Sequence, residues 1–75
     1  MIKYEQLIGN TKDIMKKQNI TQKELAERAG ITEVSVSRYM NCSRVMKVTT
    51  ITKIAYALNV SVADLFKEGL NGNNV

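Results

Sequence analysis

Five residues whose side chains could contact another molecule share one face of an expected helix over residues 33–40. They fall at positions i, i+1, i+4, i+5 and i+8, which lie on a single side of a helix. The five are Glu33, Val34, Ser37, Arg38 and Asn41. A helix that is merely solvated more often carries several Lys and Glu residues paired at i,i+4. A face of short polar groups with one guanidinium suits hydrogen bonding to the edges of nucleic-acid bases.

Two helices joined by a tight turn must position this face. Thr21 precedes a helix expected over residues 22–29, and Glu24 lies three residues after Thr21, so the pair can form a capping box. Gly30 follows this helix and suits the left-handed conformation that ends one. Thr32 can cap the second helix. A helix, a short turn containing glycine and a second helix form the helix-turn-helix pattern.

Three further helices are expected, which makes the fold class all-α with five helices. Apolar periodicity predicts a helix from Tyr4 to Gln18 and another from about Thr49 to Asn59. The inner stripe of the first is Leu7, Ile8, Thr11, Ile14 and Met15. Its Lys12, Lys16 and Lys17 lie toward its C-terminal end, where cations complement the helix dipole.

A short last helix is expected after Ser61. Ser61 and Asp64 have the spacing of a capping box. The residues expected to face inward are Val62, Leu65 and Phe66. We predict a single domain over residues 1–68. Gly and Asn dominate residues 69–75, which are therefore expected to be a disordered tail.

The composition favours some classes of protein and argues against others. The net charge of +4, from 11 Lys and Arg against 7 Asp and Glu, suits a polyanionic partner, although small proteins also carry such charge for solubility. The chain has no His and one Cys, which argues against a His-based catalytic site, a zinc cluster and an internal disulfide. We therefore expect no enzyme activity, no cofactor and no metal. The single Cys and the lack of a membrane-length apolar run predict a cytoplasmic protein.

With five helices in this order, the sequence resembles the lambda-repressor-like family of Cro and XRE-type helix-turn-helix transcriptional regulators. The resemblance covers about Leu7 to Phe66. The matching residues are Thr21, Gln22, Glu24, Leu25, Ala26, Gly30, Val36, Ser37, Ile51, Ile54, Ala55, Ala57, Leu58, Val60, Ser61 and Leu65. The resemblance implies a protein that binds double-stranded DNA, commonly as a homodimer on a palindromic operator.

The resemblance and the polar face together predict the residues that contact DNA. Those expected to face bases in the major groove are Glu33, Val34, Ser37 and Arg38. Those expected to contact phosphates are Gln22, Lys23, Thr32, Asn41, Ser43, Arg44 and Lys47. Arg38 is interpreted as a base contact because arginine to guanine is the commonest specific pairing. For Glu33 two alternatives stay open, a hydrogen bond from cytosine or stabilisation of the helix N-terminus.

The sequence departs from the family pattern in three places. Cys42 stands where the family usually has Gly, which predicts a turn of different shape in which Cys42 is a small structural residue. The loop has no Pro over residues 46–48, which predicts a more mobile loop. Met15 and Met40 stand where many relatives have a buried Arg–Glu ion pair, and we expect the two side chains to touch in an apolar contact.

The sequence therefore predicts a DNA-binding transcriptional regulator, with repression favoured over activation. A homodimer is expected because the domain is small, and the last helix with Phe66 and Leu70 is the expected contact. No small-molecule site is evident. The alternative is an antitoxin-like or anti-regulator module that uses the same fold to hold a protein. Such a module would expose a large apolar patch, and the sequence shows none outside the tail.

Overall fold

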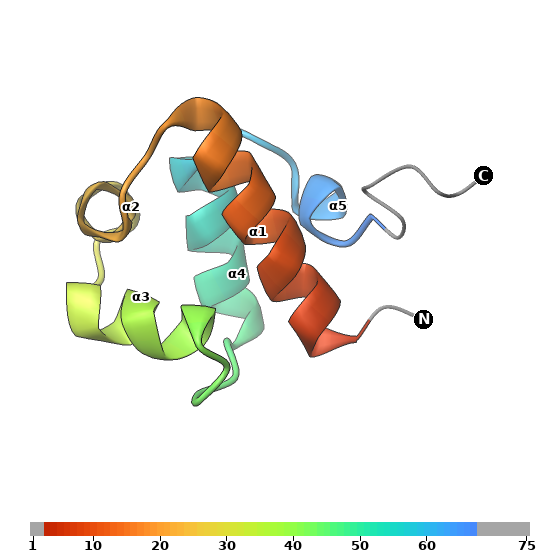
Figure 1. Ribbon diagram of the computed structural model, residues 1–75, viewed down its shortest axis with the longest axis horizontal. Coiled ribbons are helices and arrows are strands. Elements are labelled where there is room, and N and C mark those ends of the chain that lie inside the picture. Colours follow the sequence, from red (N-terminus) through yellow and green to blue (C-terminus); the bar gives the residue numbers. More distant parts are fainter. Residues whose placement is uncertain (1–2, 68–75) are drawn as a thin grey trace.

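The chain forms five α-helices around one apolar core. The computed structural model describes residues 3–67. The helices are α1 (Tyr4–Gln18), α2 (Gln22–Ala29), α3 (Glu33–Met40), α4 (Val48–Ala57) and α5 (Val62–Leu65). In Figure 1, α1 and α4 cross the centre of the molecule, with α2 and α3 on one side and α5 on the other. The all-α fold class is confirmed. The tail expected over residues 69–75, including Leu70, lies outside the described residues.

Local hydrogen bonds set the ends of α2 and α3 where the sequence predicts them. The Thr21 hydroxyl accepts the Glu24 N–H at 3.1 Å, and the Glu24 carboxylate accepts the Thr21 N–H at 2.9 Å. This second bond, from the backbone, is the main cause that lowers the pKa of Glu24. Gly30 ends α2 with a φ of 73°, and the Thr32 hydroxyl accepts the Ser35 N–H at 3.1 Å. The whole helix-turn-helix is therefore specified by groups close in sequence.

The bounds of α4 differ slightly from those expected. The helix begins at Val48 instead of about Thr49, and it ends at Ala57 before the expected Asn59. Lys47 precedes its first turn without a side-chain hydrogen bond to it, so no capping residue marks the start in the sequence. Asn59 lies beyond the helix in the left-handed region, with a φ of 59°. The polypeptide thus leaves α4 two residues earlier than we expected.

The last helix is a single turn, and only part of its expected inner face is buried. Ser61 and Asp64 form the expected capping box, with bonds of 3.0 and 3.1 Å between side chain and backbone. Leu65 is fully enclosed in the core. Val62 and Phe66 are each 38% exposed, so the prediction that they face inward is wrong. A helix of one turn can direct only one of these side chains into the core.

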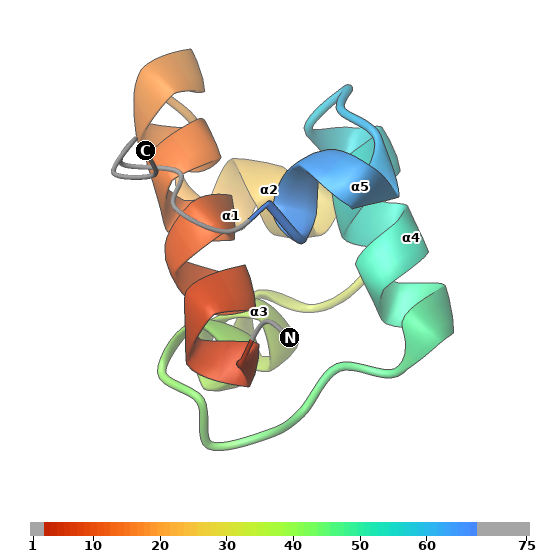
Figure 2. The same cartoon turned by 90° about the vertical axis from the view of Figure 1, so that its right-hand side faces the viewer.

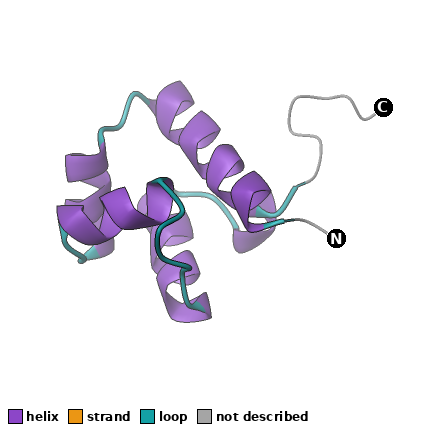
Figure 3. Cartoon of the chain, turned by 60° about the horizontal axis from the view of Figure 1, so that its bottom comes forward, coloured by secondary structure: helices purple, strands orange, loops and turns teal. Residues whose placement is uncertain are grey.

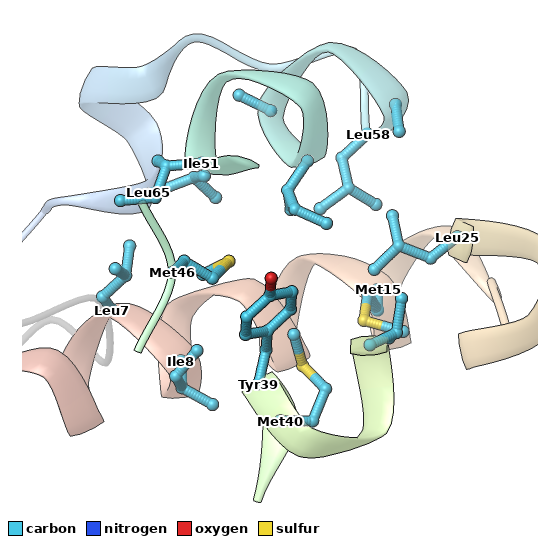
Figure 4. Close-up of a cluster of buried hydrophobic side chains, with 14 of the residues drawn as sticks. Leu7, Ile8, Met15, Leu25, Tyr39, Met40, Met46, Ile51, Leu58 and Leu65 are labelled. Atoms are coloured by element: carbon cyan, nitrogen blue, oxygen red, sulfur yellow. The ribbon is translucent and has the colours of Figure 1, made fainter. Parts of the chain in front are cut away.

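The core gathers apolar side chains from every helix and from the loop before α4 (Figure 4). The apolar residues of the described range with no exposed surface are Leu25, Val36, Ile54, Leu58 and Leu65. Ile14, expected on the inner stripe of α1, is only partly buried. Met46 of the loop is 5% exposed and packs in the same cluster. The loop is therefore attached to the core between α3 and α4.

A buried amide joins α1 to the end of α5. Asn10 is 2% exposed, and its Nδ2 donates to the carbonyls of Leu65 and Lys67 at 2.9 and 2.6 Å. These bonds satisfy carbonyl groups that a helix end leaves without partners. The apolar pattern of the sequence missed Asn10, although its position three residues after Leu7 places it on the inner side of α1.

Candidate nucleic-acid interface

The polar face of α3 is exposed, as the sequence predicts. Its opposite side, made of Val36, Tyr39 and Met40, is buried against the rest of the domain. The exposed residues of the polar face are Glu33, Val34, Ser37, Arg38 and Asn41. α3 packs mainly on α2 and also contacts α1, so the face has a rigid support. Figure 3 shows α3 and the loop that follows it together on the side of the molecule turned toward the viewer.

The turn at the end of α3 has a conformation that glycine favours. Cys42 has a φ of 63°, which lies in the left-handed region. Its N–H donates to the Tyr39 carbonyl, and the N–H of Ser43 donates to the Arg38 carbonyl at 2.9 Å. Glycine would adopt this φ readily, and a difference in turn shape from relatives stays a prediction. Cys42 adopts a backbone conformation that is unfavourable for a residue with a Cβ atom.

The loop over residues 41–47 exposes its polar and basic side chains, while its backbone is held by hydrogen bonds. The side chain of Asn41 accepts the Ser43 N–H at 2.9 Å, which tightens the turn after α3. The side chains of Arg44 and Lys47 are exposed. Tyr4 of α1, which sequence reasoning missed, bonds to the backbone of this loop. The loop that we expected to be more mobile is therefore held by a tertiary contact.

The residues expected to contact phosphates differ in their exposure and in the hydrogen bonds that they already make. Gln22 is half-buried at the start of α2, and Lys23 beside it is exposed. The Thr32 hydroxyl is already engaged, since it accepts the Ser35 N–H and donates to the Ser35 hydroxyl at 2.9 Å. Lys23 therefore has an exposed cation that could meet a phosphate. The hydroxyl of Thr32 is already used as the cap of α3.

A pocket of about 260 Å³ lies where α1, the start of α2 and the end of α3 meet. Its lining residues are Lys12, Met15, Lys16, Ile20, Gln22 and Met40. Met15 and Met40 are thus brought to the same place, 7% and 2% exposed. Their direct contact stays a prediction. The apolar floor matches the expected replacement of a polar pair by two thioethers.

The same pocket places two lysines of α1 beside Gln22. We expected Lys12 and Lys16 only to complement the helix dipole, so their place next to a candidate phosphate contact is a finding of the structure. Their spacing of four residues places both on one face of α1, but it does not indicate that Gln22 lies beside that face. Exposed basic side chains are therefore present near Gln22 as well as in the loop after α3.

The described part of the chain offers no metal cluster and no membrane-spanning helix. Within residues 3–67, no cluster of three or more His, Cys, Asp and Glu side chains could hold a metal ion. None of the helices in this range is both long and apolar enough to cross a membrane.

Several solved structures share this fold. The restriction-modification controller protein C.AhdI from Aeromonas hydrophila has a TM-score of 0.80 and 21% identity, covering 84% of this chain and 96% of that one. The hypothetical transcription factor NHTF from Neisseria has a TM-score of 0.82 and 21% identity, covering 92% and 80%. The clp gene regulator ClgR from C. glutamicum has a TM-score of 0.75 and 20% identity, covering 87% and 86%. At these identities the likeness establishes the fold.

Family membership follows from a comparison over most of the chain. Comparison with curated protein sequences found no match. The model of the Cro/C1-type helix-turn-helix DNA-binding domain matches residues 11–67, which contain α2, α3, α4 and α5. The match agrees with the two capped helices, the glycine turn and the exposed polar face described above. The chain belongs to the family of Cro/C1-type helix-turn-helix DNA-binding domains.

Proposed function

We propose that this protein regulates transcription by binding a specific duplex DNA sequence, with α3 in the major groove. One observation carries the proposal: α3 exposes its polar face, and the loop after it, with the exposed Arg44 and Lys47, lies on the same side of the molecule as α3 (Figure 3). The major groove admits a helix, and each base pair presents a distinct pattern of donors and acceptors there. The phosphates beside the groove would then lie near Arg44 and Lys47.

Base contacts and phosphate contacts have separate locations in this proposal. The base contacts are Glu33, Val34, Ser37 and Arg38, and the phosphate contacts are Gln22, Lys23, Thr32, Asn41, Ser43, Arg44 and Lys47. We add Lys12 and Lys16 to the phosphate contacts, because they line one pocket with Gln22. Phosphate contacts supply affinity and orientation, whereas the α3 face supplies preference among sequences.

A homodimer on a palindromic operator suits the size of the recognition element. α3 has eight residues, so its length of roughly 12 Å reaches only a few base pairs. Two copies related by a two-fold axis would double the contacted sequence. The partly exposed Val62 and Phe66 leave an apolar surface at α5 for this pairing. Occupying DNA in this way requires no further surface, which favours repression over activation.

One observation supports the alternative of a protein-interaction module. Val48 and Tyr56 are 78% and 84% exposed, and their spacing of eight residues places them on one side of α4. We expected no exposed apolar patch outside the tail, so this side of α4 is a second candidate interface. Two side chains make a small patch, and apolar residues scattered on a surface are normal. DNA binding is the better supported function.

The proposal is tested by selecting duplexes from a random pool and measuring their affinity at several salt concentrations. We expect the logarithm of the affinity to fall steeply with the logarithm of salt, by about 0.9 for each phosphate neutralised. Two chains should bind each selected site. Failure to enrich any sequence, together with a flat salt response, would favour the interaction module over the regulator.

A further inference from the structure

The second half of the loop before α4 depends on one distant side chain for its hydrogen bonds. The first half continues the hydrogen bonding of α3. The backbone of residues 44–46, by contrast, makes no hydrogen bond to another backbone group within the described part of the chain. The hydrogen bonds of this segment go to the hydroxyl of Tyr4. Figure 2 shows the loop passing the N-terminal end of α1, where Tyr4 lies.

The Tyr4 hydroxyl bridges two groups of the loop backbone. It donates to the Arg44 carbonyl at 3.0 Å and accepts the Met46 N–H at 3.2 Å. Partial burial raises the pKa of the Tyr4 phenol, and the hydrogen bond from Met46 acts in the opposite direction. The phenol therefore keeps its proton at neutral pH and can donate and accept at once.

A second anchor lies beside the first. The Met46 side chain is 5% exposed and packs in the core, where Figure 4 shows it between residues of several helices. The side chains of Arg44, Val45 and Lys47 around it are exposed. The buried thioether fixes one point of the loop, and the Tyr4 hydroxyl fixes the peptide groups on either side of Val45. Two cations thus flank a backbone segment that is fixed in position.

We propose that Tyr4 is a positioning residue for DNA binding. Its hydroxyl holds residues 44–46 in one conformation, so that Arg44 and Lys47 meet the DNA phosphates already in place. A loop without this restraint would lose conformational entropy on binding, which would weaken the complex. The inference rests on the proposed function, in which both cations contact phosphates.

The chain also offers a way to restore the restraint without the hydroxyl. It contains no proline, so no fixed φ limits the loop. Val48 is the first residue of α4 and is 78% exposed, and proline is favoured at this helical position. A proline there also restricts the preceding residue to extended conformations, and Lys47 already has a φ of −77° and a ψ of 161°. Val48→Pro should therefore stiffen the loop in its present shape.

The experiment compares Tyr4→Phe with the wild-type protein on a selected duplex. We expect the variant to bind about three- to tenfold more weakly, because two hydrogen bonds to the loop are lost. The amide of Met46 should exchange with solvent about tenfold faster, while amides inside α2 keep their protection. Tyr56→Phe is the matched control, since it removes the same hydroxyl from a side chain that is 84% exposed. It should change neither quantity.

Two combinations separate positioning from a general loss of structure. In a protein that already carries Arg44→Ala and Lys47→Ala, Tyr4→Phe should change the affinity by less than about twofold, because the groups it positions are gone. Adding Val48→Pro to Tyr4→Phe should restore part of the lost affinity, because it restricts Lys47, one of the two cations, in its present conformation. A purely structural role would leave the same loss in both combinations.

Each result decides for or against the proposal. Unchanged affinity of Tyr4→Phe, the full loss in the alanine background, or no recovery with Val48→Pro would overturn it. A wild-type protein that binds no duplex would contradict the proposed function instead. In that case the exchange of the Met46 amide still decides whether Tyr4 holds the loop.

Discussion

The helix-turn-helix of residues 21–40 and the loop of residues 41–47 form adjacent parts of the candidate interface, but different interactions hold them. In the helix-turn-helix, Thr21, Gly30 and Thr32 define the ends of α2 and α3 through bonds within a few residues. In the loop, residues 44–46 bond to Tyr4, which is 40 and 42 residues away.

The difference separates two tasks of a DNA-binding surface. A face expected to contact bases needs a rigid helix, and capped helices packed on one another provide it. In the loop expected to contact phosphates, residues 44–46 make no hydrogen bond to another backbone group of the described residues, so this segment needs a tertiary contact to keep its shape. In this protein α1 serves both parts. Its Met15 lines the same pocket as Met40 at the end of α3, and the hydroxyl of its Tyr4 bonds to the loop.

The largest effect is expected from a charge placed beneath α3. Met15→Arg should destabilise the protein by about 3 kcal/mol, because it puts an unpaired cation at a buried position beside Lys12 and Lys16. Adding Met40→Glu should recover part of this loss if the two side chains touch. Thermal unfolding of both single variants and the double variant measures the coupling. Additive effects would show that Met15 and Met40 are not partners.

A smaller effect separates the two parts by their role toward DNA. Arg38→Ala in α3 should weaken binding to the selected site by about 1–3 kcal/mol and relax the preference at one base pair. Arg44→Ala in the loop should weaken all sequences alike and reduce the salt slope by about one unit. Affinities for single-base variants of the site, at several salt concentrations, test both. If Arg38→Ala leaves the preference at every base pair unchanged, the prediction that Arg38 contacts a base is wrong.

The smallest effect concerns the junction between the two parts. Cys42→Gly should stabilise the protein by about 0.5–1 kcal/mol, because a left-handed φ is unfavourable for a residue with Cβ and the flexibility of unfolded glycine offsets part of the gain. Asn59→Gly is the control at a similar φ of 59°, and it should gain less because Asn tolerates this region. Chemical unfolding measures both. A destabilised Cys42→Gly would mean that the thiol contributes more than its backbone conformation costs.

Much of the fold was predictable because its signals are local. The caps at Thr21, Thr32 and Ser61 and the turn at Gly30 were all predicted from residue type and spacing, and the structure confirms them. The start predicted for α4 was one residue too late, because Lys47 gives no capping signal. The exposure of Phe66 was missed because a one-turn helix has too few residues to define an inner face.

The candidate site was predictable in part for the same reason. Every residue expected on the base-contacting face is exposed on α3, since helical periodicity alone separates it from the buried side. Lys12 and Lys16 were not recognised as neighbours of Gln22, because their proximity depends on how the turn over residues 19–21 directs α2 away from α1. Their contact with phosphate stays a proposal, as do the contacts of the other site residues.

The sequence by itself determined the helices, their caps and the polar face of α3, because each depends on groups within about one helical turn of one another. Only the tertiary structure decided what holds the loop. Nothing in the residues near Arg44 indicates that a tyrosine at the start of α1 would bond to its carbonyl. The packing of α1 against α3 brings the Tyr4 hydroxyl there, and no local pattern encodes the distance between residues so far apart in the chain.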